Sequence, residues 1–139
     1  MFIDIKSIVI DMVIILNEKL IINHDSNKKL KQVAVSGEIR FTPQELYQMT
    51  TNGKRLFKLK CEIWGKDIIT NDKLFIFNPL RYFPAISPAI SEKFTFSEIL
   101  GEGVLDEDLG KEEVYARLIL TNLASGTQII DKTETVSYK

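Results

Sequence analysis

Apolar and polar residues alternate over much of this chain with a period of two, which is the spacing of a half-buried β-strand. In residues 31–41, the odd positions from Val33 to Phe41 form an apolar side, and polar residues occupy most of the other. Residues 54–64 repeat the pattern. Such runs, separated by turn residues, are typical of a sandwich or barrel. We expect eight strands, over residues 2–16, 19–23, 31–41, 54–64, 73–78, 92–100, 113–123 and 127–138.

Residues 42–53 carry the signals of a short helix. Thr42 suits the N-cap, Pro43 the first helical position, and Glu45 completes a capping box. We expect one helix over about residues 43–50, ended by Asn52-Gly53. The predicted fold class is therefore all-β: an antiparallel β-sandwich of about eight strands with one short helix. A chain of 139 residues has the usual size of a single domain, which we place over residues 1–139.

The first predicted strand stands out because its alternation is lost. Between Ile8 and Leu16 both sides are apolar, which predicts burial on both sides. A hairpin around Asn17-Glu18 is expected to follow it. A sandwich covers one face of each sheet, so either the helix or another copy of the chain must cover the second side. In the second alternative, Val13 and Ile15 belong to an interaction surface.

Charge and composition narrow the expected partners. The chain has 18 Lys and Arg against 19 Asp and Glu, a net charge of −1. Nucleic acid is not an expected partner, because its binding usually requires a strongly basic face. The lysines could form a basic face, but outward lysines more often prevent edge strands from pairing. These lysines are residues 28, 29, 31, 54, 58 and 60.

The amino-terminal residues do not resemble a secretory signal or a transmembrane segment. Asp4, Lys6 and Asp11 interrupt the apolar stretch, and no small-residue cleavage site follows. The unbroken apolar run from Met12 to Leu16 is far shorter than the ~20 residues that cross a bilayer. A cytoplasmic location is favoured.

Few residues suit catalysis. His24 is the only histidine and Cys61 the only cysteine, so neither a zinc site nor an intrachain disulfide is expected. Cys61 falls on the apolar side of its predicted strand, which indicates an inert core thiol. We expect that the protein is not an enzyme.

Two acidic segments offer oxygen ligands for a hard cation. Residues 65–72 contain Asp67 and Asp72, and residues 102–113 contain Asp106 and Asp108. Calcium takes six to eight oxygen ligands, so several carboxylates must converge to bind it. The second segment is not an EF-hand, because Arg117 stands where the final glutamate is needed.

The two segments resemble the first and third calcium loops of C2 domains. In the second segment, Asp-x-Asp is followed by paired acids that run into an alternating strand with Leu118 and Leu120. The resemblance implies an eight-stranded antiparallel sandwich with calcium or phospholipid at one edge and partner binding elsewhere. The alternative is that the carboxylates only solvate turns. The ligands implied by the resemblance are Asp67, Asp72, Asp106, Asp108 and Glu112 or Glu113.

A proline-rich segment at residues 78–89 is a second candidate surface. Tyr82 lies in it next to Arg81, and tyrosine and arginine are common at interaction hot spots. The alternative, which we favour, is that Tyr82 and Phe83 fold under the rim of the sandwich and close the core.

Three functions fit these patterns. The first is a non-enzymatic, C2-like binding module with calcium as a candidate ligand. The second is an assembly subunit of a homo-oligomeric complex. The third, a small hydrolase, has the least support because acid–base and nucleophilic groups are scarce. A protein partner or self-association is expected, and a membrane surface is a further candidate partner.

Overall fold

The computed structural model describes residues 12–25, 30–66, 71–101 and 113–137, and these residues are mostly β-strand. The predicted all-β fold class is confirmed. The helix is α2 (Pro43–Asn52). The strands are β1 (Ile14–Asp25), β2 (Leu30–Arg40), β3 (Phe57–Gly65), β4 (Asp72–Ile76), β5 (Arg81–Phe83), β6 (Ser91–Gly101), β7 (Glu113–Asn122), β8 (Gln128–Lys132) and β9 (Val136–Ser137).

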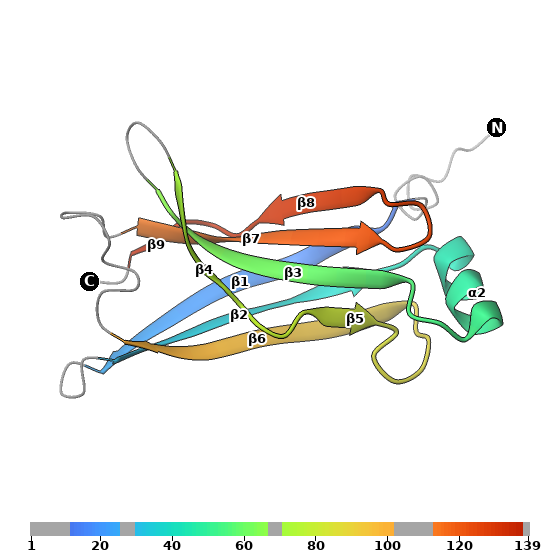
Figure 1. Ribbon diagram of the computed structural model, residues 1–139, viewed down its shortest axis with the longest axis horizontal. Coiled ribbons are helices and arrows are strands. Elements are labelled where there is room, and N and C mark those ends of the chain that lie inside the picture. The colour runs from blue at the N-terminus through green and yellow to red at the C-terminus, as the bar shows by residue number, and fades with distance from the viewer. Residues whose placement is uncertain (1–11, 26–29, 67–70, 102–112, 138–139) are drawn as a thin grey trace, which may run out of the picture.

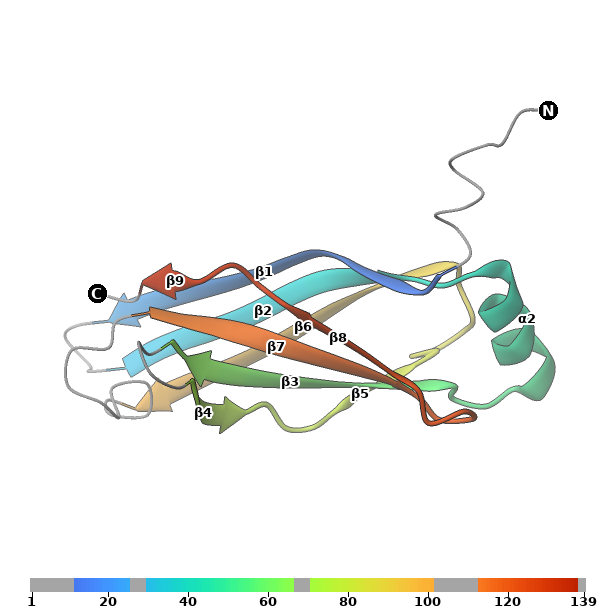
Figure 2. The ribbon, with the colours of Figure 1, turned by 90° about the horizontal axis from the view of Figure 1, so that it is seen from above.

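The strands form two antiparallel sheets. The first sheet has the order β1-β2-β6, and the second has the order β4-β3-β7-β8. β5 also pairs with β3, and β9 with β7, so β3 and β7 occupy the centre of the second sheet. The long strands of both sheets run along the long axis of the molecule, with α2 at one end (Figures 1 and 2).

The hydrophobic core fills the space between the sheets. The alternation predicted for residues 31–41 and 54–64 is present in β2 and β3, whose odd positions supply core residues. Burying these side chains removes apolar surface from water, which is the main favourable term in folding. The largest fully buried side chains include Val33, Val35 and Ile39 of β2, Leu59, Cys61 and Ile63 of β3, Phe96 of β6, and Leu118 and Leu120 of β7.

The helix begins as the sequence predicts. The backbone N–H of Glu45 donates to Oγ1 of Thr42 at 3.3 Å, and Gly53 ends the helix with a φ of 61°. α2 lies at the end of the sandwich (Figure 2) and does not cover the outer side of β1, which was one of the two predicted alternatives. The described residues include no helix long and apolar enough to span a membrane.

The predicted hairpin around Asn17-Glu18 is wrong. β1 continues through both residues, and its register against β2 shifts between Leu16 and Lys19. Leu16 pairs with Glu38 and Lys19 with Ser36, so β1 carries one extra residue and forms a β-bulge. Asn17 has a φ of 54°, a conformation that asparagine tolerates and that turns and bulges share.

Two other strand predictions needed correction. The last predicted strand, 127–138, is divided into β8 and β9, and Thr133 lies between them. Thr133 is buried, and its backbone N–H donates to the Ala116 carbonyl while its Oγ1 accepts from the Ala116 N–H, both at 2.9 Å. The proline-rich segment also contributes β5, which pairs with β3.

Candidate functional site

Basic side chains gather on the outer side of the second sheet. Residues that pair directly across antiparallel strands share a face, and Glu62 pairs with Arg117, which pairs with Lys132. The same register places Lys58 and Lys60 of β3 on this side, because inward and outward positions alternate. The outward positions include Glu62 and Glu113 as acids. We define the cationic face by its five basic residues: Lys58, Lys60, Lys73, Arg117 and Lys132.

The local charge of this face differs from that of the whole chain. The net charge of the chain is −1, whereas the cationic face has five basic groups beside two acids at outward positions of its strands. Lys58 and Lys60 lie on β3, which is flanked by β7 on one side and by β4 and β5 on the other. The interpretation that these two lysines protect an edge strand is therefore wrong.

Glu62 lies beneath these basic groups. Its side chain is only 3% exposed, and its Oε2 is 3.3 Å from Nζ of Lys60 and 3.4 Å from Nζ of Lys73. Its Oε1 accepts a hydrogen bond of 3.0 Å from the indole Nε1 of Trp64 and lies 4.0 Å from Nη1 of Arg117. One buried carboxylate therefore gathers side chains from three strands.

The electrostatics of Glu62 favour its charged form. Burial by itself would raise the pKa of this carboxyl, but the hydrogen bonds from Trp64 and Lys60 and the charges of Lys60 and Lys73 outweigh burial. The pKa of Glu62 is therefore lower than its ordinary value, and the group is ionised at neutral pH. The side chains of Lys60 and Lys73 remain about two-fifths exposed, so they still present positive charge to solvent.

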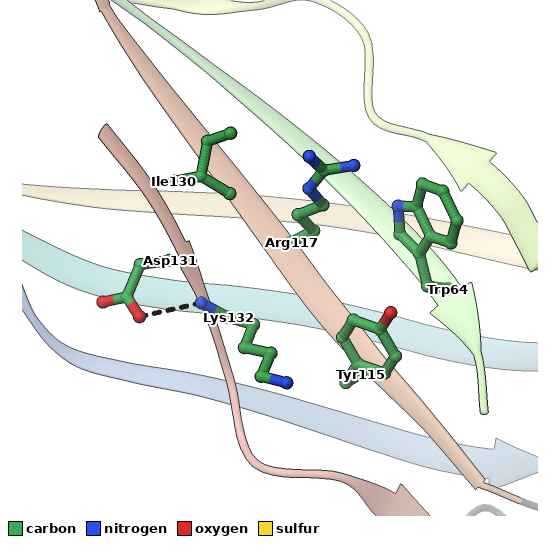
Figure 3. A pocket seen from close by; sticks show the side chains of 6 residues that line it. All are labelled: Trp64, Tyr115, Arg117, Ile130, Asp131 and Lys132. Carbon is green, nitrogen blue, oxygen red and sulfur yellow. Dashed lines mark hydrogen bonds between the residues drawn. The ribbon is translucent and has the colours of Figure 1, made fainter. Parts of the chain in front are cut away.

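A pocket of about 320 Å³ opens beside Glu62 on the same side of the sheet. Figure 3 shows Arg117 between Trp64 and Ile130, and the ammonium of Lys132 extended toward the ring of Tyr115. The guanidinium carbon of Arg117 is 5.4 Å from the centre of the Trp64 ring, and Nζ of Lys132 is 5.8 Å from that of Tyr115. The lining residues are Trp64, Tyr115, Arg117, Ile130, Asp131 and Lys132.

Asp131 connects the pocket to the first sheet. The side chain of Glu18, in the bulge of β1, shares a hydrogen bond with the Asp131 carboxyl. Burial, this hydrogen bond and the nearby charge of Asp131 raise the pKa of Glu18, and its own backbone N–H only partly opposes them. Oε2 of Glu18 is buried and has no hydrogen-bond partner. The bulge therefore aims a carboxyl at the edge of the pocket.

Most of the predicted calcium ligands lie outside the described residues. These are Asp67, Asp106, Asp108 and Glu112, and their predicted role remains a prediction. Asp72 begins β4, and Glu113 begins β7. Among the described residues, no group of three or more His, Cys, Asp and Glu side chains could hold a metal ion.

The described residues that flank both acidic segments lie at the same end of the sandwich, opposite α2 (Figures 1 and 2). Gly65, at the end of β3, pairs with Asp72 on one side and with Val114 on the other. The backbone N–H of Lys66 donates to the Glu113 carbonyl at 3.0 Å. The resemblance to C2 domains implies that the two segments share one edge of the sandwich, and the pairing of β3 with β7 brings the strand ends that flank them together.

The four residues predicted for an interaction surface are mostly buried. Val13 and Ile15 are 8% and 7% exposed and belong to the core of this chain. Phe83 is buried too, and its ring centre lies 6.2 Å from that of Phe41. Tyr82 is half-buried beneath the guanidinium of Arg55, at 5.1 Å from its ring centre. Phe83 thus follows the favoured alternative and closes the core, whereas Tyr82 pairs with Lys58 and lies on the outer side of the second sheet.

The two residues considered for catalysis lie apart from the cationic face. His24 is an exposed residue of β1, opposite Lys31 of β2. Cys61 is fully buried on the inner side of β3, and burial raises the pKa of its thiol, so the thiol is protonated at neutral pH.

Comparisons with known proteins do not assign a family. No model of a known protein family matches the chain, and no curated protein matches it either. A solved structure entitled "X-ray structure of Northeast Structural Genomics Consortium target SoR45" is similar at 11% sequence identity and a TM-score of 0.36. The similarity covers 90% of this chain and 82% of that chain. A similarity this low supports no argument about function.

Proposed function

We propose that this chain is a non-enzymatic binding module that holds an acidic segment of a partner protein on its cationic face. The observation that supports the proposal best is the gathering of five basic residues from four strands on one face of the second sheet, three of them around the buried carboxylate of Glu62, in a chain whose net charge is slightly negative. A one-sided charge distribution of this kind steers a ligand of opposite charge to one surface.

The positions of the basic groups support a specific anion-binding surface rather than a general excess of positive charge on the chain. Arg117 and Lys132 are directly opposite each other on β7 and β8. Like charges in this position destabilise a pair of strands. An anion placed between the two side chains would relieve their repulsion, so an acidic ligand is expected to stabilise this part of the sheet.

Aliphatic residues between the basic groups favour a protein segment over single-stranded nucleic acid. Ile76, Ile119 and Ile130 share the outer side of the sheet, and Ile76 and Ile130 are about half exposed. Nucleic-acid surfaces instead present open aromatic faces on which bases stack. Here Arg117 and Lys132 already lie over the rings of Trp64 and Tyr115.

The test is binding of a fluorescein-labelled peptide rich in Asp and Glu, measured by fluorescence anisotropy. Affinity should fall as salt rises from about 50 to 300 mM, because the interaction is between largely exposed charges. The double variant Lys58→Glu with Lys60→Glu should bind about tenfold more weakly, as expected for losing and reversing two surface contacts.

A matched control variant distinguishes the effect of the cationic face on binding from the effect of the total charge of the chain. The double variant Lys19→Glu with Lys93→Glu changes the net charge equally, but these exposed lysines lie on β1 and β6 of the first sheet. It should bind as the wild type does. Equal loss in both double variants would contradict the proposal, and so would tighter binding of a single-stranded oligonucleotide to the same face.

Calcium-dependent binding is a second candidate function, and one observation favours it. The strand ends that flank the two acidic segments are neighbours, with Gly65 between Asp72 and Val114 in the second sheet. Calcium needs carboxylates from more than one segment to approach one another, and this pairing supports such an approach.

A further inference from the structure

The pocket at the end of the cationic face combines apolar walls with two basic groups. Trp64, Tyr115 and Ile130 supply the apolar walls, Arg117 and Lys132 supply the basic groups, and Asp131 is the one acid among the lining residues. Ile130 is 52% exposed although it lies on a strand. A volume of about 320 Å³ is at the lower end of the range for ligand pockets, which suits one large side chain.

The side chains that line the pocket favour a ligand that is partly apolar as well as negatively charged. A purely acidic segment would contact Arg117 and Lys132 but would leave Ile130 and the edges of the aromatic rings in water. An apolar side chain placed between them would bury that surface at about 25 cal/mol per Å². The two basic groups flank this position (Figure 3), so carboxylates would be needed on either side of the apolar side chain.

We infer that the pocket recognises a short sequence in the acidic segment of the partner. This sequence has one large apolar side chain with a carboxylate on each side of it. The apolar side chain seats against Ile130 and Trp64, and the flanking carboxylates contact Arg117 and Lys132. The inference rests on the proposed function, because it names which acidic segments the cationic face selects.

Trp64 provides a direct readout of the pocket. It is the only tryptophan of the chain, so its fluorescence reports on this site alone. Two unlabelled peptides of equal charge are compared, one with leucine and one with serine at the centre of the same acidic sequence. The leucine peptide should bind about tenfold more tightly, equivalent to about 1.4 kcal/mol. It should also shift the Trp64 emission to shorter wavelength, whereas the serine peptide should not.

Substitution of an exposed isoleucine tests whether the preference for the leucine peptide comes from this pocket. Ile130→Thr keeps a β-branched residue on β8 and should reduce the preference for leucine over serine to about twofold or less. Ile99→Thr is the matched control. Ile99 is also an exposed strand residue, at 62%, but it lies on β6 of the first sheet. This control should keep the full preference.

The possible failures are distinguishable. If both peptides bind equally and both lose affinity in salt, the inference is overturned but the proposed function stands. If neither peptide binds, as judged by Trp64 fluorescence and by competition with the fluorescein-labelled peptide in the anisotropy assay, the proposed function fails and the inference fails with it. A preference for leucine that survives in Ile130→Thr would also overturn the inference, because the selecting surface would then lie elsewhere.

Discussion

Glu62 shows how a single side chain organises a surface from beneath. An outward position on a strand normally places a carboxylate in water, yet Glu62 is covered by Trp64 and by the basic groups it attracts. Its charge holds Lys60 and Lys73 in place without neutralising the whole cationic face. The alternation of β3 predicted the direction of this side chain, but its burial depends on residues from β4 and β7.

Glu62→Gln should destabilise the protein at neutral pH by about 1–2 kcal/mol, within the range for hydrogen bonds to charged groups. Because folding lowers the pKa of Glu62, its charge contributes stability above the unfolded value, near 4.5. That contribution is lost as the pH falls through the folded pKa. Urea unfolding should therefore show the wild type and the variant converging between about pH 5 and pH 3. A difference that stays constant over this range would contradict the assignment.

Glu18 should behave in the opposite way. Folding raises its pKa, so its stabilising contribution is complete below the unfolded value of about 4.5 and is lost as the pH rises through the folded pKa. Glu18→Gln should therefore stabilise the protein at pH 7 by about 1 kcal/mol, and the gain should shrink toward pH 4. Thermal melts at both values measure this. Glu98→Gln, at an exposed position of β6, is the control and should change little.

At the scale of elements, the bulge of β1 depends on close packing across the first sheet. A Cβ at Gly37 would lie 2.6 Å from Cζ of Phe94 and 3.2 Å from the Leu16 carbonyl oxygen. Phe94 is buried, so its ring cannot move without disturbing the core. The absence of a side chain at Gly37 therefore makes room both for the aromatic ring and for the backbone of the bulge.

Gly37→Ala should destabilise the fold by about 1–3 kcal/mol, as overpacking of a core does. Gly101→Ala is the matched control. A Cβ at Gly101 has no heavy atom within 4 Å, so this substitution should be neutral or slightly stabilising. Chemical denaturation of both variants measures the difference. Equal stabilities would mean that Phe94 adjusts without cost.

Among the elements, the sequence predicted secondary structure best where a local pattern is typical of only one kind of structure. Thr42, Pro43 and Glu45 are typical of a helix start, and α2 begins there. Asn17 was ambiguous, because a left-handed residue occurs both in hairpin turns and in bulges. The choice between them depends on the partner strand: β2 is long enough to pair with β1 on both sides of Asn17.

At the scale of the whole molecule, the acidic segments define a prediction about cations. If their carboxylates hold calcium at the weak end of the usual range, with a Kd of roughly 10⁻⁴ M, then about 10 mM calcium should stabilise the fold by about 2.7 kcal/mol. The melting temperature should then rise by about 5 °C or more. Magnesium should do much less, because it requires a tighter octahedral site.

The variant Asp72→Asn with Glu113→Gln serves as the control for this cation effect. It removes two of the predicted ligands, both at the described strand ends. Its melting temperature should respond less to calcium than that of the wild type. Equal melting temperatures of the wild type in calcium and magnesium would show that the acidic segments bind no calcium.

The sequence by itself determined most of the long strands, their inward and outward positions and the start of the helix, because alternation and capping are local properties of the chain. It identified Lys58 and Lys60 as outward residues of one strand. Only the tertiary structure decided that β3 is a central strand, and that Lys73, Arg117 and Lys132 join these lysines on one face. Strand pairing is settled by the packing of the whole core, so residues more than fifty positions apart, such as Glu62 and Arg117, become neighbours without any local sequence signal.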